Sequence, residues 1–500
     1  MRAPDTEDTP RRRRLKVGGP LRALVAVAAG AGLVYAATNA DAQVFWTRHS
    51  DVQQVSTASS AARSQVLCPG PDRPGSPGTE SDDQSVDVMT ALAPSTVLPS
   101  VHRGASGSGT VTATRLPAPS GGAPHVVAAQ GRQTSDSTSG GGAVQVIGEG
   151  SDARGLLVMQ TSTDDTKTAR GLSLLQCSAP TDDAWLVGGG AQPGRLARLV
   201  LSNPGDGPID VDAEVIGRHG TSRSKSAHDV VVPARGRTVV VLGALGKDNA
   251  DPVVHVTSTG GVVQASLMDV WMTGETRSGE ALTGPTQAPA RSQVLPAVTS
   301  TGAAPQVRIA VPGAAEGIVR VRVTDTHGAV VTDQVATIAA GSTGAVTLHG
   351  LSKGTYAVHV TADEPVVASA SSRTATKGTS DLAWMPAAHP VTGLTGFALP
   401  HHTDGAALML TAPGHGASVD VVTMSSAGEP TTKKVTIPAD RPVEVPVTSA
   451  ASGWVSVTKG SVYAGLVVHG EDGSGPLVAG TALHPVPLRA EVADARPADQ

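Results

Sequence analysis

The chain has 500 residues, a formal net charge of −5 at pH 7, 58 glycines, 36 prolines and 2% aromatic residues. This length is too great for one hydrophobic core and suits roughly three or four domains of about 100 to 150 residues each. The chain has no basic stripe interleaved with aromatic residues, so we expect no nucleic-acid partner. Frequent turns and small branched side chains predict an all-β protein with thin cores, built as a string of domains.

A basic tail (1–22) precedes an apolar segment (23–42) at the N-terminus. Positive charge on one side of such a segment holds that side in the cytoplasm, which predicts that the rest of the chain lies outside. The apolar run is intermediate between a signal peptide and a membrane span. We favour an uncleaved transmembrane anchor in the cell membrane, because Phe45 and Trp46 could lie at the outer headgroups. The alternatives are secretion after cleavage near Ala42 and a twin-arginine export signal.

Only two cysteines occur, Cys68 and Cys177. Both are predicted to lie outside the membrane, where oxidising conditions permit a disulfide, and we expect them to pair. Closing a loop of about 100 residues in this way would stabilise the fold by about 4 to 5 kcal/mol. The alternative is a reactive thiol or a metal site.

Composition divides the part of the chain beyond the anchor. We expect a polar stalk over 43–64, a β-rich region holding the disulfide over 65–183, three sandwich repeats over 184–298, 299–390 and 391–488, and a disordered tail over 489–500. Within the β-rich region, residues 69–83 and 134–142 are low in apolar side chains and are predicted to be mobile loops.

The three repeats are recognised by one recurring strand pattern. In each repeat a charged or polar residue alternates with inward-facing aliphatic ones, centred on Val211, Val321 and Val421. Units of about 90 residues with about seven alternating strands predict immunoglobulin-like or fibronectin-like sandwiches. Each repeat is expected to close on a short strand with Pro, at 294–296, 384–386 and 483–485. Residues 64–69 resemble 292–296, so this first strand is expected to pair within or beside a distant repeat.

A family resemblance rests on four groups of residues, namely Cys68-Pro69-Gly70, Cys177, Asp183-Ala184-Trp185 with Gly188-Gly189, and 199–204. Here the chain resembles an uncharacterised family of secreted or membrane-anchored proteins of high-GC actinobacteria. The resemblance implies an envelope location and supports the pairing of Cys68 with Cys177, and it implies no activity. Leu186 stands where the family usually has a second aromatic residue.

No motif indicates catalysis, and we expect neither an enzyme nor a cofactor. Ser222 and Lys225 fit S-x-x-K, but the companion motifs of serine enzymes are missing. The paired carboxylates at 82–83, 164–165 and 182–183 are neighbours and do not face one another as glycosidase carboxylates do. The Gly188–Gly190 turn has no following helix to bind phosphate. His401, His402 and Asp404, with His389 and His415, are the best metal candidate, although solvated loop histidines are the simpler interpretation and no metal is expected.

Tryptophans are the remaining candidates for ligand binding, because aromatic rings can stack on sugars. We expect Trp384 and Trp454 to fill cores, and Trp185 and Trp271, which lie beside loops, are the candidate ligand-facing aromatics. The sequence thus favours a non-catalytic envelope scaffold or adaptor that binds wall polysaccharide or a membrane protein partner. The alternatives are an accessory subunit of a membrane glycosyltransferase and a divergent envelope hydrolase.

Overall fold

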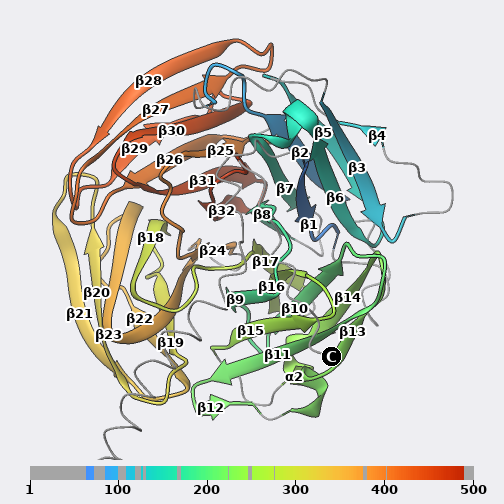
Figure 1. Ribbon diagram of the computed structural model, residues 1–500. Helices are drawn as coiled ribbons and strands as arrows, with labels where there is room; N and C mark the ends of the chain where they lie inside the picture. Colours follow the sequence, from blue (N-terminus) through green and yellow to red (C-terminus); the bar gives the residue numbers. More distant parts are fainter. Residues whose placement is uncertain are drawn as a thin grey trace, which may run out of the picture. The chain divides into compact units, whose positions relative to one another are not determined.

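Strands make up nearly all the regular structure of the described part of the chain (Figure 1). The structure is a computed structural model, and it describes residues 63–71, 85–98, 109–118, 125–127, 131–165, 170–222, 224–245, 251–274, 276–374, 380–400 and 403–488. The all-β prediction is confirmed: within these ranges the helical segments are η2 (Gly150–Ala153), η3 (Lys225–Ala227) and α2 (Leu242–Leu245). No helix of the described part is long and apolar enough to cross a membrane. The basic tail, the predicted anchor, the stalk as far as residue 62 and the C-terminal tail lie outside the described residues.

The strands form four successive two-sheet units, which we call sandwiches I to IV. Sandwich I contains β1 (Arg63–Cys68), β2 (Ser85–Leu92), β3 (Thr110–Leu116), β4 (His125–Val126), β5 (Gln133–Ser139), β6 (Ala143–Glu149), β7 (Leu156–Asp165) and β8 (Arg170–Gln176). Sandwich II contains β9 (Asp183–Val187), β10 (Arg195–Asn203), β11 (Ile209–Gly217), β12 (Gly220–Thr221), β13 (Val230–Val232), β14 (Gly236–Val241), β15 (Val253–Thr259), β16 (Gln264–Thr273) and β17 (Thr276–Thr283).

Sandwich III contains β18 (Ala290–Ser300), β19 (Gln306–Val311), β20 (Gly317–Thr324), β21 (Val330–Ile338), β22 (Ser342–Thr347), β23 (Gly354–Arg373) and β24 (Leu382–Pro386). Sandwich IV contains β25 (Leu394–Ala398), β26 (Gly405–Thr411), β27 (Ala417–Met424), β28 (Pro430–Ile437), β29 (Val443–Pro446), β30 (Ser452–Lys459), β31 (Tyr463–Asp472) and β32 (Gly475–Leu483).

All four sandwiches share one antiparallel strand order. Sandwich I has sheets β1-β6-β3-β4 and β5-β2-β7-β8, and sandwich IV repeats them as β25-β30-β27-β28 and β29-β26-β31-β32. In sandwich II, β12 and β13 divide the fourth position. In sandwich III the long strand β23 crosses from one sheet to the other and supplies the sixth and seventh positions. The sequence therefore encodes four copies of one eight-position unit, where the repeat pattern predicted three.

This order differs from the immunoglobulin type that the alternation suggested. In an immunoglobulin domain the first strand lies beside the second and the seventh beside the sixth. Here the first strand pairs with the sixth, as β1 does with β6, and the seventh pairs with the second, as β7 does with β2. Alternation reports which side chains face inward, and it carries no information about which strand is the neighbour.

The inward positions of the repeats agree with the sequence pattern. Val211, Val321 and Val421 lie on the third strands β11, β20 and β27 and are 0%, 0% and 1% exposed. The charged residues that alternate with them, such as Asp210 and Arg320, are exposed. A slip of one residue would bury these charges, so the register follows from the sequence.

Three predictions about strands need correction. Residues 292–296 lie in β18, which opens sandwich III and does not close sandwich II, so the predicted boundary at 298 falls inside a strand. Residues 64–68 lie in the equivalent opening strand β1, which pairs with β6 of its own sandwich and not with a distant repeat. Residues 134–139, expected to be part of a mobile loop, form most of the polar strand β5, which pairs with β2 at the edge of its sheet. An edge strand needs no regular apolar face, which is why β5 carried no signal.

The eighth strands bring the four sandwiches together. β8 contacts β17 and β32, and β24 contacts the same two strands, so the contacts close a cycle within residues 59–500 (Figure 1). Apolar side chains of sandwiches I and IV share one core cluster, and those of III and IV share another. The four units form a closed ring about their last strands and not the string of domains that the composition suggested.

Candidate functional site

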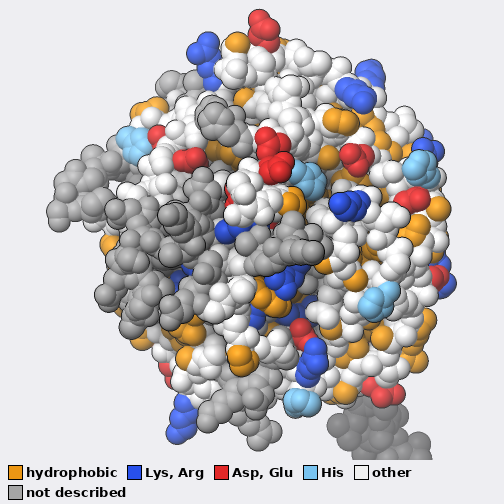
Figure 2. Space-filling model, turned by 180° about the vertical axis from the view of Figure 1, so that it is seen from behind, with side chains coloured by type: hydrophobic (Ala, Val, Ile, Leu, Met, Phe, Trp, Pro, Cys, Tyr) orange, Lys and Arg blue, Asp and Glu red, His pale blue; other side chains and the backbone are white. Residues whose placement is uncertain are grey.

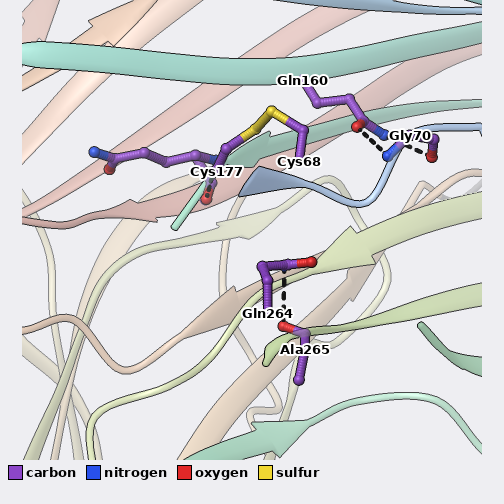
Figure 3. The surroundings of a disulfide bond; sticks show 8 residues. Cys68, Gly70, Gln160, Cys177, Gln264 and Ala265 are labelled. Carbon is purple, nitrogen blue, oxygen red and sulfur yellow. Dashed lines mark hydrogen bonds between the residues drawn. A yellow bond between two sulfur atoms is a disulfide. The ribbon is translucent and has the colours of Figure 1, made fainter. Parts of the chain in front are cut away.

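The predicted disulfide is confirmed, and it lies beside a tight turn of sandwich I (Figure 3). Cys68 ends β1 and Cys177 follows β8, and their Cα atoms are 4.8 Å apart. The side chain of Gln160 clamps the next turn, accepting a hydrogen bond from Gly70 N at 2.8 Å and donating one to Gly70 O at 3.2 Å. Gly70 has a φ of +72°, and a Cβ there would lie 1.9 Å from Gly142 O. The Cys-Pro-Gly motif therefore serves the fold of sandwich I.

The two candidate ligand-facing tryptophans are engaged within the protein. Trp185 is 8% exposed, stacks on His255 with ring centroids 4.0 Å apart, and belongs to a buried cluster that joins sandwich II to sandwich III. Trp271 is half-buried, with the guanidinium of Arg373 3.6 Å and that of Arg195 4.7 Å from its ring centroid. Two cations over one ring leave it little free face for a sugar.

Trp384 and Trp454 are buried, as expected for core residues. Trp384 also joins two sandwiches, because its Nε1 donates to Asp269 Oδ2 at 2.8 Å. The guanidinium of Arg308 lies 4.8 Å from the Trp384 ring centroid and donates to Asp251 Oδ1 and to the carbonyl oxygen of Gly188, each at 3.0 Å. The Gly188 turn, considered above for phosphate, thus anchors sandwich II to sandwich III.

The histidines and carboxylate of the metal candidate are dispersed. His389 Nδ1 lies 3.2 Å from His484 Nδ1, and burial and the neighbouring His389 lower the pKa of His484 to about 3. Asp404 N donates to the carbonyl oxygen of His469, and His415 lies in a groove described below. His401 and His402 lie outside the described residues. Within the described ranges no three His, Cys, Asp or Glu side chains could hold one metal ion.

Ser222 and Asp183 also have structural partners. Ser222 Oγ donates to the carbonyl oxygen of Leu245 at 3.0 Å. Asp183 Oδ2 lies 3.0 Å from His255 Nε2 on the neighbouring strand. Asp82 and Asp83 lie outside the described residues.

A single carboxylate connects the four eighth strands at the centre of the ring. Asp381 is fully buried and precedes β24. Its Oδ1 accepts hydrogen bonds from the backbone N–H groups of Glu280 and Leu382, at 3.3 and 2.9 Å. Its Oδ2 accepts from those of Leu172 and Val478, at 3.2 and 2.9 Å. Burial raises the pKa of Asp381 to about 7, although these four hydrogen bonds oppose the rise. Asp381 is a structural hub of the ring.

An open groove lies between sandwiches III and IV, with a cavity volume of about 950 Å³. We call it the III–IV groove. Its floor is the outward face of three neighbouring strands, with Ser292 and Val294 on β18, His359 and Thr361 on β23, and Arg320 and Arg322 on β20. Its wall comes from sandwich IV and the segment before β25, with Thr392, Pro413, Gly414, His415, Asp440, Gly460, Ser461 and Tyr463.

The polar groups of the III–IV groove are partly ordered by contacts with each other. Ser292 Oγ lies 2.8 Å from His359 Nε2, and Arg320 forms two hydrogen bonds to Asp333, at 2.6 and 2.7 Å. Burial lowers the pKa of His359, with Asp440 opposing this effect. The arrangement offers hydroxyl, imidazole and guanidinium groups beside one tyrosine ring, with charges of both signs. Lys and Arg are likewise scattered among acidic and apolar side chains on the face shown in Figure 2.

Sequence reasoning missed the III–IV groove. It identified Arg320 and Arg322 only as outward-facing charges of a strand, and His415 only as a metal candidate. The floor and the wall come from two different sandwiches, so no local spacing relates them. The one available signal was the pair of arginines on an outward face that carries valine or aspartate in the other repeats.

Comparison with known proteins gives a family but no activity. No curated protein is significantly similar to the chain. Among solved structures, the crystal structure of a tetra-tandem repeat in the extending region of a large adhesion protein is 13% identical, with 75% of this chain and 91% of that chain covered. Its TM-score of 0.09 is too low to support any argument. A family model matches residues 130–448, from sandwich I into sandwich IV, and the chain therefore belongs to the Family of unknown function (DUF5719).

Proposed function

We propose that this chain is a non-catalytic scaffold of the cell envelope that binds wall polysaccharide in the III–IV groove. The groove carries the proposal. Its volume of about 950 Å³ is at the upper end of the usual range for ligand sites. Sugar hydroxyls need closely spaced donors and acceptors, which Ser292, Thr361 and Ser461 can supply, and Tyr463 offers a ring for stacking.

The closed ring supports a scaffold role. Both sides of the groove belong to sandwiches whose cores are continuous, so the floor and the wall are held at one separation. A preformed site loses less entropy when it binds an extended polymer.

We place these sandwiches outside the cell membrane, held by residues 23–42. This part of the proposal rests on the basic residues that precede the apolar segment. A reporter that is active only outside the membrane should work when fused after Gln500 and fail when fused before Arg11. The reverse pattern would refute this location.

Binding is tested with the full chain in detergent micelles and two labelled probes, soluble wall-polysaccharide fragments that are neutral and fragments that carry carboxylates or phosphates. We expect the double variant Arg322→Ala, Tyr463→Ala to weaken binding of at least one probe tenfold or more, since it removes a donor from the floor and a ring from the wall. Lys433→Ala, on an exposed position of β28 outside the groove, is the matched control and should bind as the wild type does. Absence of binding, or equal binding by all three proteins, would count against polysaccharide and leave a membrane protein as the partner to test.

A further inference from the structure

The fourth strand position is an edge of its sheet in all four sandwiches, and three of them protect it. In sandwich I the strand β4 has two residues, and in sandwich II β12 and β13 have two and three. In sandwich IV, β28 is longer, but it begins with Pro430 and exposes Lys433 and Lys434. Short strands, proline and lysine are the usual means by which proteins prevent an edge from pairing with another chain.

Sandwich III has none of these features at the same position. Its strand β21 has nine residues and pairs only with β20 among the described strands. Val330, Val331 and Val335 are 51%, 44% and 67% exposed, and Ile318 on β20 is 53% exposed. A long edge with exposed aliphatic side chains can accept another strand.

The sequence of β21 indicates which strand that is. Residues 331–335 read Val-Thr-Asp-Gln-Val, which is nearly symmetric about Asp333. If two copies of β21 pair antiparallel about Asp333, Val331 of each copy faces Val335 of the other. Val330 then faces Ala336, and Thr332 faces Gln334. Antiparallel pairing of identical strands has two-fold symmetry, so it closes at a dimer.

Each carboxylate at the centre of this pairing already has two cations beside it, and the four guanidinium groups exceed the two carboxylates by two charges. Two facing Asp333 carboxylates alone would repel. Each is held by two hydrogen bonds from Arg320 of its own chain and lies 3.6 Å from Arg322 Nε. The centre would thus contain two carboxylates and four guanidinium groups.

We propose that the chain forms a homodimer in which β21 pairs antiparallel with β21 of a second copy about Asp333. The sheet β18-β23-β20-β21 of each copy then becomes half of one continuous eight-stranded sheet. The inference does not depend on what the III–IV groove binds.

Cross-linking tests the register in the full chain in detergent micelles. Residues opposite one another on antiparallel strands have Cα atoms about 4.5 to 5.5 Å apart, which suits a disulfide. Asp333→Cys should therefore give a covalent dimer on mild oxidation. Thr337→Cys, on the same strand, should give no covalent dimer under the same conditions. Position 337 of one copy would face position 329 of the other, eight residues from that copy's own position 337. Cys68 and Cys177 are paired and do not interfere.

Sedimentation tests the interface without a cysteine. We expect the wild type to sediment as a dimer and Val335→Lys to weaken dimerisation at least tenfold, whereas Thr431→Lys on β28 should sediment as the wild type does. A monomeric wild type would overturn the proposal and direct attention to a strand from a different protein. A dimer unaffected by Val335→Lys, or equal cross-linking at positions 333 and 337, would also overturn it.

Discussion

Asp381 shows how one side chain serves four sandwiches. Its carboxylate accepts backbone hydrogen bonds from β8, β17, β24 and β32, one strand from each sandwich. Desolvation favours the protonated acid, whereas the N–H donors favour the carboxylate. With a pKa of about 7 in the folded chain and 3.8 as the ordinary value, desolvation prevails.

This pKa predicts a pH dependence of stability that belongs to Asp381. The folded state keeps the proton up to about pH 7, while the unfolded chain loses it near pH 4, so the contribution to stability falls as pH rises through this window. The difference corresponds to roughly 4 kcal/mol. Asp381→Asn keeps one acceptor oxygen but turns an NH2 group toward two of the four N–H donors, so it should be less stable than the wild type at pH 4. This difference in stability should narrow as pH rises to 8, because only the wild type loses stability over that window. Urea unfolding of both proteins across this range measures the gap.

Asp206→Asn, on a carboxylate whose side chain is 91% exposed, is the control and should show no such gap. If the stability of the wild type rose relative to that of Asp381→Asn with rising pH, the four N–H donors would outweigh desolvation. The pKa of Asp381 would then be lowered and not raised.

At the scale of elements, one strand pattern was used four times with different local solutions. The third strand keeps its inward aliphatic residues in sandwiches II to IV, as at Val211, Val321 and Val421. The sixth and seventh positions are separate strands in sandwiches I, II and IV, whereas in sandwich III the single strand β23 supplies both. The inward aliphatic faces are kept in each sandwich, whereas the connections between consecutive strands vary.

The disulfide is the covalent element of sandwich I, and it joins the end of β1 to the segment after β8. Because it closes a loop with a sequence separation of 109 residues, the double variant Cys68→Ser, Cys177→Ser should lower the free energy of unfolding by about 2 to 5 kcal/mol. Urea unfolding with and without a reducing agent measures this loss. The agent should destabilise the wild type and leave the double variant unchanged. An equal effect on both proteins would mean that another reaction is being measured.

At the scale of the whole ring, the sandwiches depend on one another. Core clusters are shared between I and IV and between III and IV, and Arg170 on β8 donates to Asp472 of sandwich IV at 2.7 Å. A linear array would bury only one interface per neighbouring pair and would leave its two ends independent.

The ring therefore predicts cooperative unfolding across residues 63–488. Asp381→Ala removes the acceptor of four backbone N–H groups, and we expect it to lower the protection of amides in all four sandwiches by a similar amount. Native-state hydrogen exchange with mass spectrometry measures this protection for each sandwich. Asp206→Ala is the control. Loss of protection confined to sandwich III would contradict cooperativity around the ring.

The sequence alone determined the features that depend on local alternation of apolar and charged residues or on the presence of only two cysteines. Alternating valines and charges fixed the inward faces of β11, β20 and β27, because burying Asp210 or Arg320 would be costly. The two cysteines had only one another as partners. Composition favoured β-sandwiches over helical bundles. It gave the wrong prediction for β5, because a polar edge strand resembles a loop.

The tertiary structure decided everything that joins residues distant in the chain. No pattern relates Leu172, Glu280, Asp381 and Val478, which meet only because four eighth strands converge. The same holds for the III–IV groove, whose floor and wall belong to different sandwiches. Strand neighbours and ring closure follow from how whole sheets bury their outer faces. A period of two residues predicts which side chains face inward, but not which strands or sheets become neighbours.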